Sequence, residues 1–527
     1  MRVGARLGCL VAGLLVILVV LFALPTRLPG GAEDSFLGGQ RNDPIARLSL
    51  RADMHASRAL PLRFVDFVGD VAGGDLGHSP VIGADVGAVV GERTVESLLF
   101  AAVALAVAWS LRRWRRTRSR RRATGAVPGV VVALPVLAAL VVGARFGAMP
   151  FSAPHAALVS RAGASLLPAL ALGAGLAAWM AIGRRSTREV VAAVALGTIV
   201  TEAVFALPGL GSTFAQSTAG LDPMTTRGVF FAIAVAVLLA LVVLPGVERG
   251  ETNTGSLGGR AARGVVATAW VAAVVVAIAA RLHLGLPAAA RIGADGPSGS
   301  SGAHPFGTDA VGRDVLARVL ATGRGSLLLV VAAVVIATVV GSVIGVVIGF
   351  AGGPLERIGV AALKGWAAFP GELVALVLLT FNGRSGARAA VALAFVAAPA
   401  IARGAQQRTL AAVQESDPDL ATGAWVRSFG SHVSFGVVRA TLATVFVAAG
   451  RVLAAEIIAG LLGVGPAATQ TWSREIASQL PFAAHAPQAV AAPLLVALVT
   501  AAALAALGNA IRPSSPVALA APPVDDR

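Results

Sequence analysis

Long runs of apolar residues recur along the whole 527-residue chain. Each run is long enough for one membrane-crossing helix, which needs about 20 residues because the lipid core offers an open backbone no hydrogen-bond partners. The chain is therefore expected to be an all-α integral membrane protein. The runs predict twelve spans, near Gly8–Leu24, Val95–Leu111, Val127–Gly143, Gly163–Gly183, Glu189–Ala206, Gly228–Leu244, Gly264–Ala280, Ser326–Phe350, Ile358–Phe381, Ala387–Ala402, Val437–Leu462 and Ala486–Gly508.

Arginine-rich segments lie beside the ends of the predicted spans. Residues 112–122 contain eight arginines, and Arg184, Arg185 and Arg188 follow two crossings later. Because basic residues mark the cytoplasmic side of short loops, counting spans from these loops places both termini in the cytoplasm of a multi-pass plasma-membrane protein. The net charge of +16 then reflects topology, and no nucleic-acid partner is predicted.

The first apolar segment has a second interpretation. Arg2 and Arg6 precede it and the small residue Ala23 lies near its end, which is also typical of a cleaved signal peptide. Cleavage would leave an odd number of spans. Cys9 lies in this segment and is the only cysteine, so the chain has no internal disulfide and no thiolate metal site.

The two halves of the chain repeat one another. Glu202 is followed by Gly209 and Gly211, and Glu456 is followed by Gly463 and Gly465 at the same spacing. Ser-Leu-Leu begins both the second span, at residue 97, and the eighth, at residue 326. Six spans per half give both halves the same orientation in the membrane, as two parallel repeats. We expect a first half at 1–246, a cytoplasmic linker at 247–263 and a second half at 264–527.

Motifs of nucleotide hydrolysis and of other catalysis are missing. The single lysine, Lys364, is followed by Gly365 where a phosphate-binding loop requires Ser or Thr. The sequence contains neither H-E-x-x-H nor G-x-S-x-G. We therefore predict neither an enzymatic activity nor a cofactor or metal site.

Three segments resemble one family. Residues 304–315, H-P-F-G-T-D-A-V-G-R-D-V, resemble the signature of the C-type permease subunit of dipeptide, oligopeptide and nickel ABC importers. Residues 74–79, G-D-L-G-H-S, and residues 201–211, T-E-A-V-F-A-L-P-G-L-G, are similar to motifs of the partner B-type subunit. The chain thus looks like both subunits of a type I ABC importer permease fused in one polypeptide.

The resemblance implies a transport component without ATPase activity. Such permeases work with separate cytoplasmic ABC ATPase subunits and an extracytoplasmic solute-binding protein, and substrate passes between the two halves within the lipid bilayer. It leaves the substrate open among peptides, nickel and other small solutes. The ATPases act on short cytoplasmic coupling helices, the E-A-A-x-x-x-G loops of the family.

The sequence departs from the family at these loops. In the second half Gly423 takes the place of the loop glycine, but Asp417 replaces the glutamate. In the first half Arg188-Glu189-Val190 runs within a dozen residues into Thr201-Glu202, so we predict that the loop is missing. The predicted coupling residues, all in the second half, are Glu415, Asp417, Asp419, Ala421, Gly423 and Ala424.

The outer segment of the second half has two interpretations. Thr308 and Asp309 are able to cap a helix, and Asp309 with Arg313 forms an i, i+4 pair, so the segment is expected to hold a short helix across the mouth of the bundle. Alternatively it contacts the binding protein. Its candidate residues are Gly307, Thr308, Asp309, Gly312, Arg313 and Asp314.

Glu202 and Glu456 are the candidates within the membrane. A carboxylate at this depth faces the bundle interior or a wet cavity, or else lies just outside the hydrocarbon and caps a helix. The repeat predicts that the fifth and eleventh spans face each other across a pseudo-two-fold axis. Gly341, Gly345 and Gly349 recur every fourth residue in the eighth span, where close helix packing is expected.

Two other functional classes stay open. A secondary transporter also has a duplicated bundle, but typically has broken helices and ion-binding polar groups at mid-membrane. A non-transporting scaffold or sensor derived from a permease is favoured by the missing first loop.

Overall fold

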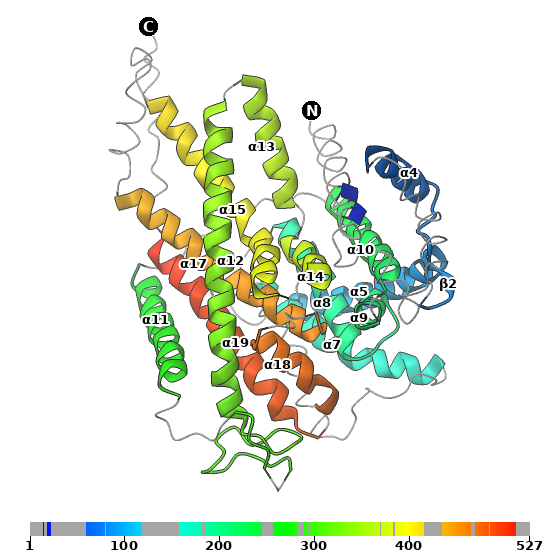
Figure 1. Cartoon of the computed structure of the whole chain (residues 1–527), viewed down its shortest axis with the longest axis vertical. Coiled ribbons are helices and arrows are strands. Elements are labelled where there is room, and N and C mark those ends of the chain that lie inside the picture. The colour runs from blue at the N-terminus through cyan, green and yellow to red at the C-terminus, as the bar shows by residue number, and fades with distance from the viewer. Residues whose placement is uncertain are drawn as a thin grey trace, which may run out of the picture.

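The computed structural model describes residues 60–79, 81–116, 158–181, 186–220, 222–244, 257–281, 289–293, 296–351, 353–368, 370–382, 385–415, 435–464, 469–483 and 485–512, with a few single positions in 14–22. Within these residues the chain is mainly helical, in agreement with the predicted all-α membrane class (Figure 1). The elements are α4 (Leu60–Ala72), β1 (His78–Ser79), β2 (Ala84–Asp85), α5 (Val86–Arg116), α7 (Leu158–Ala181), α8 (Thr187–Val204), α9 (Leu210–Ala219), α10 (Pro223–Val243), α11 (Leu257–Ala280), α12 (Val315–Ala351), α13 (Gly353–Ala368), α14 (Gly371–Asn382), α15 (Gly386–Glu415), α17 (Phe435–Leu461), α18 (Trp472–Gln479), η2 (Leu480–Phe482) and α19 (Pro487–Ile511).

Among the described residues, seven helices are long and apolar enough to span a membrane, and the bent pair α13 and α14 would make an eighth. The seven lie in α5, α10, α11, α12, α15, α17 and α19, and each overlaps a predicted span. The predicted fourth and fifth spans correspond to α7 and α8. The third, Val127–Gly143, and most of the first, including Cys9, lie outside the described residues, so the total of twelve stays a prediction.

Several predicted spans differ from the helices in their limits or in their shape. Helix α12 begins at Val315 and not at Ser326, and α15 continues to Glu415, so the segment after Arg403 is helix where a loop was expected. Apolar runs report only the part of a helix that lies in lipid, whereas arginine and glutamine favour continuation of the helix into water. The predicted ninth span is bent by 73° between α13 and α14, beside Pro370, which lacks a backbone N–H.

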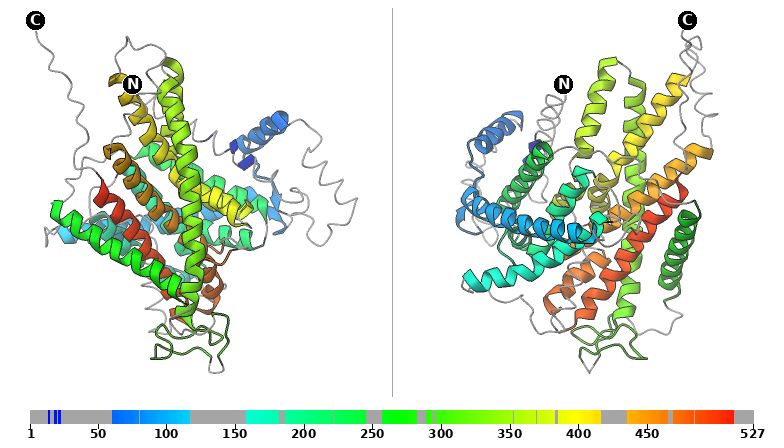
Figure 2. Two further views of the ribbon diagram at one scale, coloured as in Figure 1. Left: turned by 60° about the vertical axis from the view of Figure 1, so that its left-hand side comes forward. Right: turned by 180° about the vertical axis from the view of Figure 1, so that it is seen from behind.

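Helices α12, α15, α17, α18 and α19 pack in the same pairs as α5, α7, α8, α9 and α10. Helix α5 packs against α7, α8, α9 and α10, and α12 packs against α15, α17, α18 and α19. The short helix α9 lies on α8 and α10, and α18 lies on α17 and α19 in the same way. Helices α8 and α17 also contact each other near the centre of the molecule, where one hydrophobic core includes residues of both (Figures 1 and 2).

The glycines of α12 allow close contact with α15. A Cβ atom at Gly341 would lie 2.9 Å from the carbonyl oxygen of Ala398, and one at Gly349 would lie 2.7 Å from Thr409 Cβ. Gly345, between them, faces the Ala402 carbonyl even more closely. This confirms the packing role predicted for the three glycines. The opposite face of α12 presents exposed valines, as expected of a lipid-facing surface: Val331, Val335, Val339, Val343 and Val347.

Candidate functional site

Two glutamates are buried at corresponding places in the two sets of helices. Glu202, near the end of α8, is 0% exposed, and Glu456, in α17, is 1% exposed. The Ser97 hydroxyl, from α5, donates to Glu202 Oε2 at 2.9 Å. The Ser326 hydroxyl, from α12, donates to Glu456 Oε1 at 2.6 Å. A serine of one long helix thus holds a glutamate of another in both sets.

The same serine oxygens also accept hydrogen bonds from the two short helices. The backbone N–H of Leu210, the first residue of α9, donates to Ser97 Oγ at 2.8 Å. The backbone N–H of Trp472, the first residue of α18, donates to Ser326 Oγ at 2.8 Å. We call each arrangement a serine–glutamate clamp. Each clamp joins three helices: α5, α8 and α9 in the first, and α12, α17 and α18 in the second.

The clamps combine the two roles considered for these glutamates. Both side chains lie in the interior of the bundle, and Glu202 Oε2 also accepts the N–H of Gly211 at 2.7 Å, in the first turn of α9. A carboxylate is favoured there because a helix N-terminus has unsatisfied N–H groups and a positive dipole end. Among the described residues, one oxygen of each carboxylate has no hydrogen-bond partner: Glu202 Oε1 and Glu456 Oε2.

The equal glycine spacing after the two glutamates does not indicate equivalent positions. Gly209 precedes α9, whereas Gly463 ends α17 with a φ of 73°. The residue that ends α8 in this left-handed conformation is Ala206, with a φ of 48°. Helix α17 therefore continues further past its glutamate than α8 does, and a longer connection leads to Trp472 than to Leu210. The predicted equivalence of Gly209 and Gly463 is wrong, although the equivalence of the glutamates fits the geometry.

Residues 304–314, for which an outer position was predicted, form a turn and not the predicted short helix. Asp309 is 0% exposed, and its Oδ1 accepts the backbone N–H groups of Val311 at 3.1 Å and of Arg313 at 2.9 Å. Its Oδ2 accepts Arg313 Nε at 2.6 Å, so the predicted i, i+4 pair is present. Gly307 and Gly312 have φ values of 73° and 77°, which glycine adopts without strain.

The helix cap of this segment also differs from the prediction. Asp314 caps α12, because its Oδ1 accepts the N–H of Ala317 at 2.6 Å and its Oδ2 lies 2.7 Å from His304 Nδ1. Thr308 instead binds the preceding loop, donating to the Gly296 carbonyl at 2.9 Å and accepting the Ser298 N–H at 2.6 Å. These side chains bind the loop backbone and one another, and such local bonds compete with the backbone bonds of a helix.

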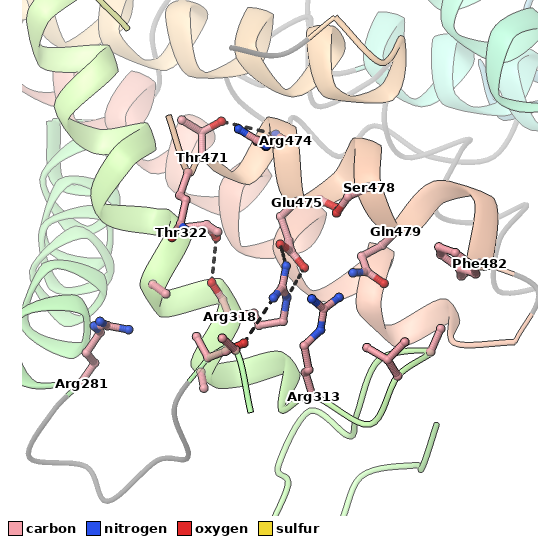
Figure 3. Close-up of a pocket in the computed structure, with 17 residues that line it drawn as sticks. Arg281, Arg313, Arg318, Thr322, Thr471, Arg474, Glu475, Ser478, Gln479 and Phe482 are labelled. Carbon is pink, nitrogen blue, oxygen red and sulfur yellow. Dashed lines mark hydrogen bonds and ion pairs between the residues drawn. The ribbon is translucent and has the colours of Figure 1, made fainter. Parts of the chain in front are cut away.

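An ion pair joins the first turn of α12 to α18, the short helix of the second clamp (Figure 3). Arg318, in the first turn of α12, donates from Nε to Glu475 Oε1 of α18 at 2.6 Å and also binds Glu475 Oε2 through a terminal nitrogen. Its Nε lies 3.8 Å from Asp309 Oδ2. Neither Arg318 nor Glu475 belongs to a recognisable sequence motif, so neither was predicted as a site residue. The two clamp serines were noticed as repeated residues, but no role was predicted for them.

The chain is similar in sequence to permease proteins of bacterial transport systems. The dipeptide transport system permease protein DppC of Escherichia coli strain K12 is 37% identical over 221 residues, which cover 41% of this chain and 73% of that protein. The glutathione transport system permease protein GsiD of Escherichia coli O1:K1 is 29% identical over 224 residues, 41% of this chain and 72% of that protein. No protein-family profile matches the chain.

The chain belongs to the family of dipeptide-type ABC transport permeases. GsiD of Pectobacterium atrosepticum is a further relative, 31% identical over 112 residues, which cover 21% of this chain and 37% of that protein. The described helices, with several spans of bilayer length, agree with a multi-pass membrane permease.

The coupling residues expected of such a permease fall largely outside the described residues. Asp417, Asp419, Ala421, Gly423 and Ala424 all lie in 416–434, and Glu415 is the last residue of α15. At the place where a first coupling loop is missing from the sequence, α7 ends at Ala181 and α8 begins after Ser186. The Ser186 side chain accepts the N–H of Glu189, and the Glu189 side chain accepts the N–H of Ser186. This capping box marks the start of α8. Only four residues, 182–185, separate it from the end of α7.

Proposed function

We propose that the chain forms the translocation pathway of an ABC importer for peptides or a similar small solute. Separate ABC ATPase subunits would supply the energy, and an extracytoplasmic binding protein would deliver the solute. The observation that carries the proposal is the pair of serine–glutamate clamps, each of which joins two long helices to a short one in a chain of the permease family.

We further propose that one chain supplies both halves of the pathway, with 1–246 and 264–527 joined by the linker 247–263. Three observations support this division. Both clamps contain the serine–glutamate bond and the bond from the first N–H of a short helix, the same pairs of helices pack in each set, and α8 contacts α17 at the centre of the molecule. An importer needs two such bundles, because alternating access arises when one bundle rocks against the other.

The clamps would couple the short helices to this motion. Each serine oxygen lies between a carboxylate and the first N–H of α9 or α18, so displacement of α8 or α17 would carry the short helix with it. Hydrogen bonds to a buried carboxylate are among the stronger ones, so each group of three helices would move as a unit. In this mechanism α9 and α18 open and close the outer end of the pathway.

The topology that we propose places both termini in the cytoplasm and the segments 25–94 and 281–325 outside. The arginines of residues 112–122 and of the linker support it. In this orientation α12 runs inward from Val315, and the extension of α15 to Glu415 projects into the cytoplasm. By its length, about 20 Å for the residues after Ala402, this extension would reach an ATPase subunit.

A scaffold or sensor derived from a permease is the second candidate. The observation that favours it is the connection 182–185 between α7 and α8, which is too short for a coupling helix. A single coupling loop in the second half would make ATPase contact one-sided.

Reconstitution distinguishes these functions. Proteoliposomes that contain the chain, its ATPase subunits and its binding protein are expected to accumulate a labelled dipeptide only when ATP is enclosed with the ATPases. Uptake by the chain alone, driven by an ion gradient, would instead identify a secondary transporter. Failure of the ATPase subunits to co-purify with the chain would favour the scaffold.

A further inference from the structure

Two hollows among the described helices differ in the chemistry of their walls. One, of about 850 Å³, lies beside α18 and is lined by polar side chains and by four arginines (Figure 3): Arg281, Arg313, Arg318 and Arg474. The other, of about 440 Å³, is a groove between α11 and α19. Alanine and valine make up most of the wall of this α11–α19 groove, and its one charged residue is Arg263.

The α11–α19 groove opens towards the lipid-facing side of the bundle. Ala267 and Ala503 form its floor and are buried, whereas Val266 and Val499 on its rim are exposed. Helix α11 lies at the edge of the molecule and packs mainly on α19 (Figure 1). The outward face of α11 carries further exposed valines, as a lipid-facing surface does: Val265, Val275 and Val276. An occupant of the groove must therefore be apolar along most of its length.

Trp270 bounds the groove at the end away from Arg263. Its Nε1 donates to the Thr500 hydroxyl of α19 at 3.1 Å, which holds the indole ring against the wall. Trp270 lies seven residues along α11 from Arg263, a rise of about 10 Å in a helix. The groove is thus an apolar channel of this length with a cation at one end.

The cationic end of the groove lies where three helix ends meet. A Cβ atom at Gly264 would lie 2.8 Å from Ala510 Cβ, so the start of α11 packs closely on the end of α19. Arg439, near the start of α17, donates from Nε to the Ile511 carbonyl at 2.6 Å. Arg512, directly after α19, is exposed. Two further arginines therefore lie at the end of the groove that Arg263 lines.

Among the described residues, these helix ends carry an excess of positive charge. Helices α11 and α19 contain no aspartate or glutamate, and α17 contains only Glu456. Glu456 is 17 residues from Arg439, or about 25 Å along the helix, and its carboxylate belongs to the second clamp. In the proposed topology the same ends lie at the cytoplasmic surface, where basic residues attract the phosphates of anionic lipids.

We propose that the α11–α19 groove binds one anionic phospholipid, with its phosphate at Arg263 and an acyl chain along the alanines towards Trp270. A guanidinium group matches the geometry of phosphate oxygens and binds them in two-pronged fashion. A neutral lipid fits the same apolar wall but lacks the charge that the arginines attract. The bound lipid joins α11 to α19 at the start of α11. This inference needs only a chain that spans a membrane and is independent of whether it transports a solute.

Native mass spectrometry of the full chain tests the proposal, after release from nanodiscs that hold equal amounts of phosphatidylglycerol and phosphatidylcholine. The wild type is expected to retain phosphatidylglycerol in preference. Arg263→Gln should lower the retained ratio of phosphatidylglycerol to phosphatidylcholine by about fivefold, because one basic residue at the surface is removed. Added phosphatidylglycerol should raise the unfolding temperature of the wild type and have less effect on this variant.

Arg357→Gln is the matched control for the charge. Arg357 is an exposed arginine near the start of α13, on the proposed cytoplasmic side, and does not line the groove. Ala506→Phe places a ring in the groove and should reduce retention of both lipids. Its control is Ala272→Phe, at an exposed position of α11 outside the groove. If Ala506→Phe does not fold, the comparison of Arg263→Gln with Arg357→Gln decides alone.

Three results would overturn the proposal. The wild type retains the two lipids equally, or Arg357→Gln lowers the ratio as much as Arg263→Gln does. Folded Ala506→Phe retains as much lipid as Ala272→Phe. The wild type is released as a lipid-free dimer that Ala506→Phe converts to a monomer, which would show that a second copy of the chain occupies the groove.

Discussion

Ser326 and Glu456 are 130 positions apart in the chain, yet the serine hydroxyl donates to the glutamate carboxylate at 2.6 Å within a fully buried site. Ser97 and Glu202 repeat this contact at 2.9 Å. Because each serine also accepts the first N–H of a short helix, removing its hydroxyl deprives two buried groups of a partner at once.

Removal of either clamp serine should therefore destabilise the protein. We expect Ser97→Ala and Ser326→Ala each to lower the free energy of unfolding by about 1–3 kcal/mol, since a buried carboxylate and a backbone N–H both lose a hydrogen bond. Thermal unfolding of the detergent-purified chain measures this. Ser110→Ala, an exposed serine of α5, the helix that also carries Ser97, serves as the control and should be neutral. A clamp variant as stable as this control would contradict the role given to the hydroxyl.

Energetic coupling should be confined to partners within one clamp. In a double-mutant cycle, Ser326→Ala and Glu456→Gln are expected to be non-additive by about 0.5–3 kcal/mol, because the two side chains share a hydrogen bond. The cross pair Ser97→Ala and Glu456→Gln should be additive within about 0.5 kcal/mol, because no contact joins them. Equal coupling in both pairs would show a global effect in place of two separate clamps.

Close packing of α12 on α15 gives a third prediction. Gly345→Val would place a side chain against the backbone carbonyl of Ala402, and neighbouring backbone cannot yield as a flexible side chain does. We expect a loss of about 1–3 kcal/mol or failure to fold, measured by thermal unfolding and by yield of monodisperse protein. Val343→Ala, on the lipid-facing side of the same helix, is the matched control and should have little effect.

Cysteine accessibility on a Cys9→Ser background tests the topology. Ser301→Cys, in the exposed outer loop, should react with a membrane-impermeant maleimide in intact cells. Arg357→Cys, exposed near the start of α13, should react only after permeabilisation. The opposite pattern would invert the proposed orientation, which was derived from arginine placement.

Contact with the ATPase subunits is predicted to be asymmetric and to be made mainly by the second half of the chain. Deletion of residues 415–428, or Gly423→Val, should abolish ATPase co-purification and uptake, because the first half has only the connection 182–185 to offer. Charge changes at Arg184 and Arg185 should instead affect topology. Wild-type ATPase binding by the deletion variant would show that another segment makes the contact.

Much of the architecture follows from local sequence. Apolar run length placed each of the seven spans found among the described residues, and the fourfold spacing of Gly341, Gly345 and Gly349 indicated a packed face. Both signals are local, because each membrane-spanning helix must form its backbone hydrogen bonds within itself. The same signal misplaced the start of α12 and the end of α15, because both helices continue beyond the apolar run into segments that contain charged residues.

The candidate site was only partly predictable. The repeat identified Glu202 and Glu456, but their partners, the ends of α8 and α17 and the true cap at Asp314 emerged only from the folded chain. Equal spacing suggested that Gly209 and Gly463 correspond, although connections of different length lead to α9 and α18.

By itself, the sequence determined the membrane class, most of the spans and the existence of matched glutamates, because hydrophobic length and repeated residues are written along the chain. Only the tertiary structure decided that Ser326 lies against Glu456, that Arg318 lies against Glu475 and that four arginines line one cavity. Those contacts join residues more than a hundred positions apart. Their partners are chosen by how helices pack in three dimensions, which no local pattern of residues encodes.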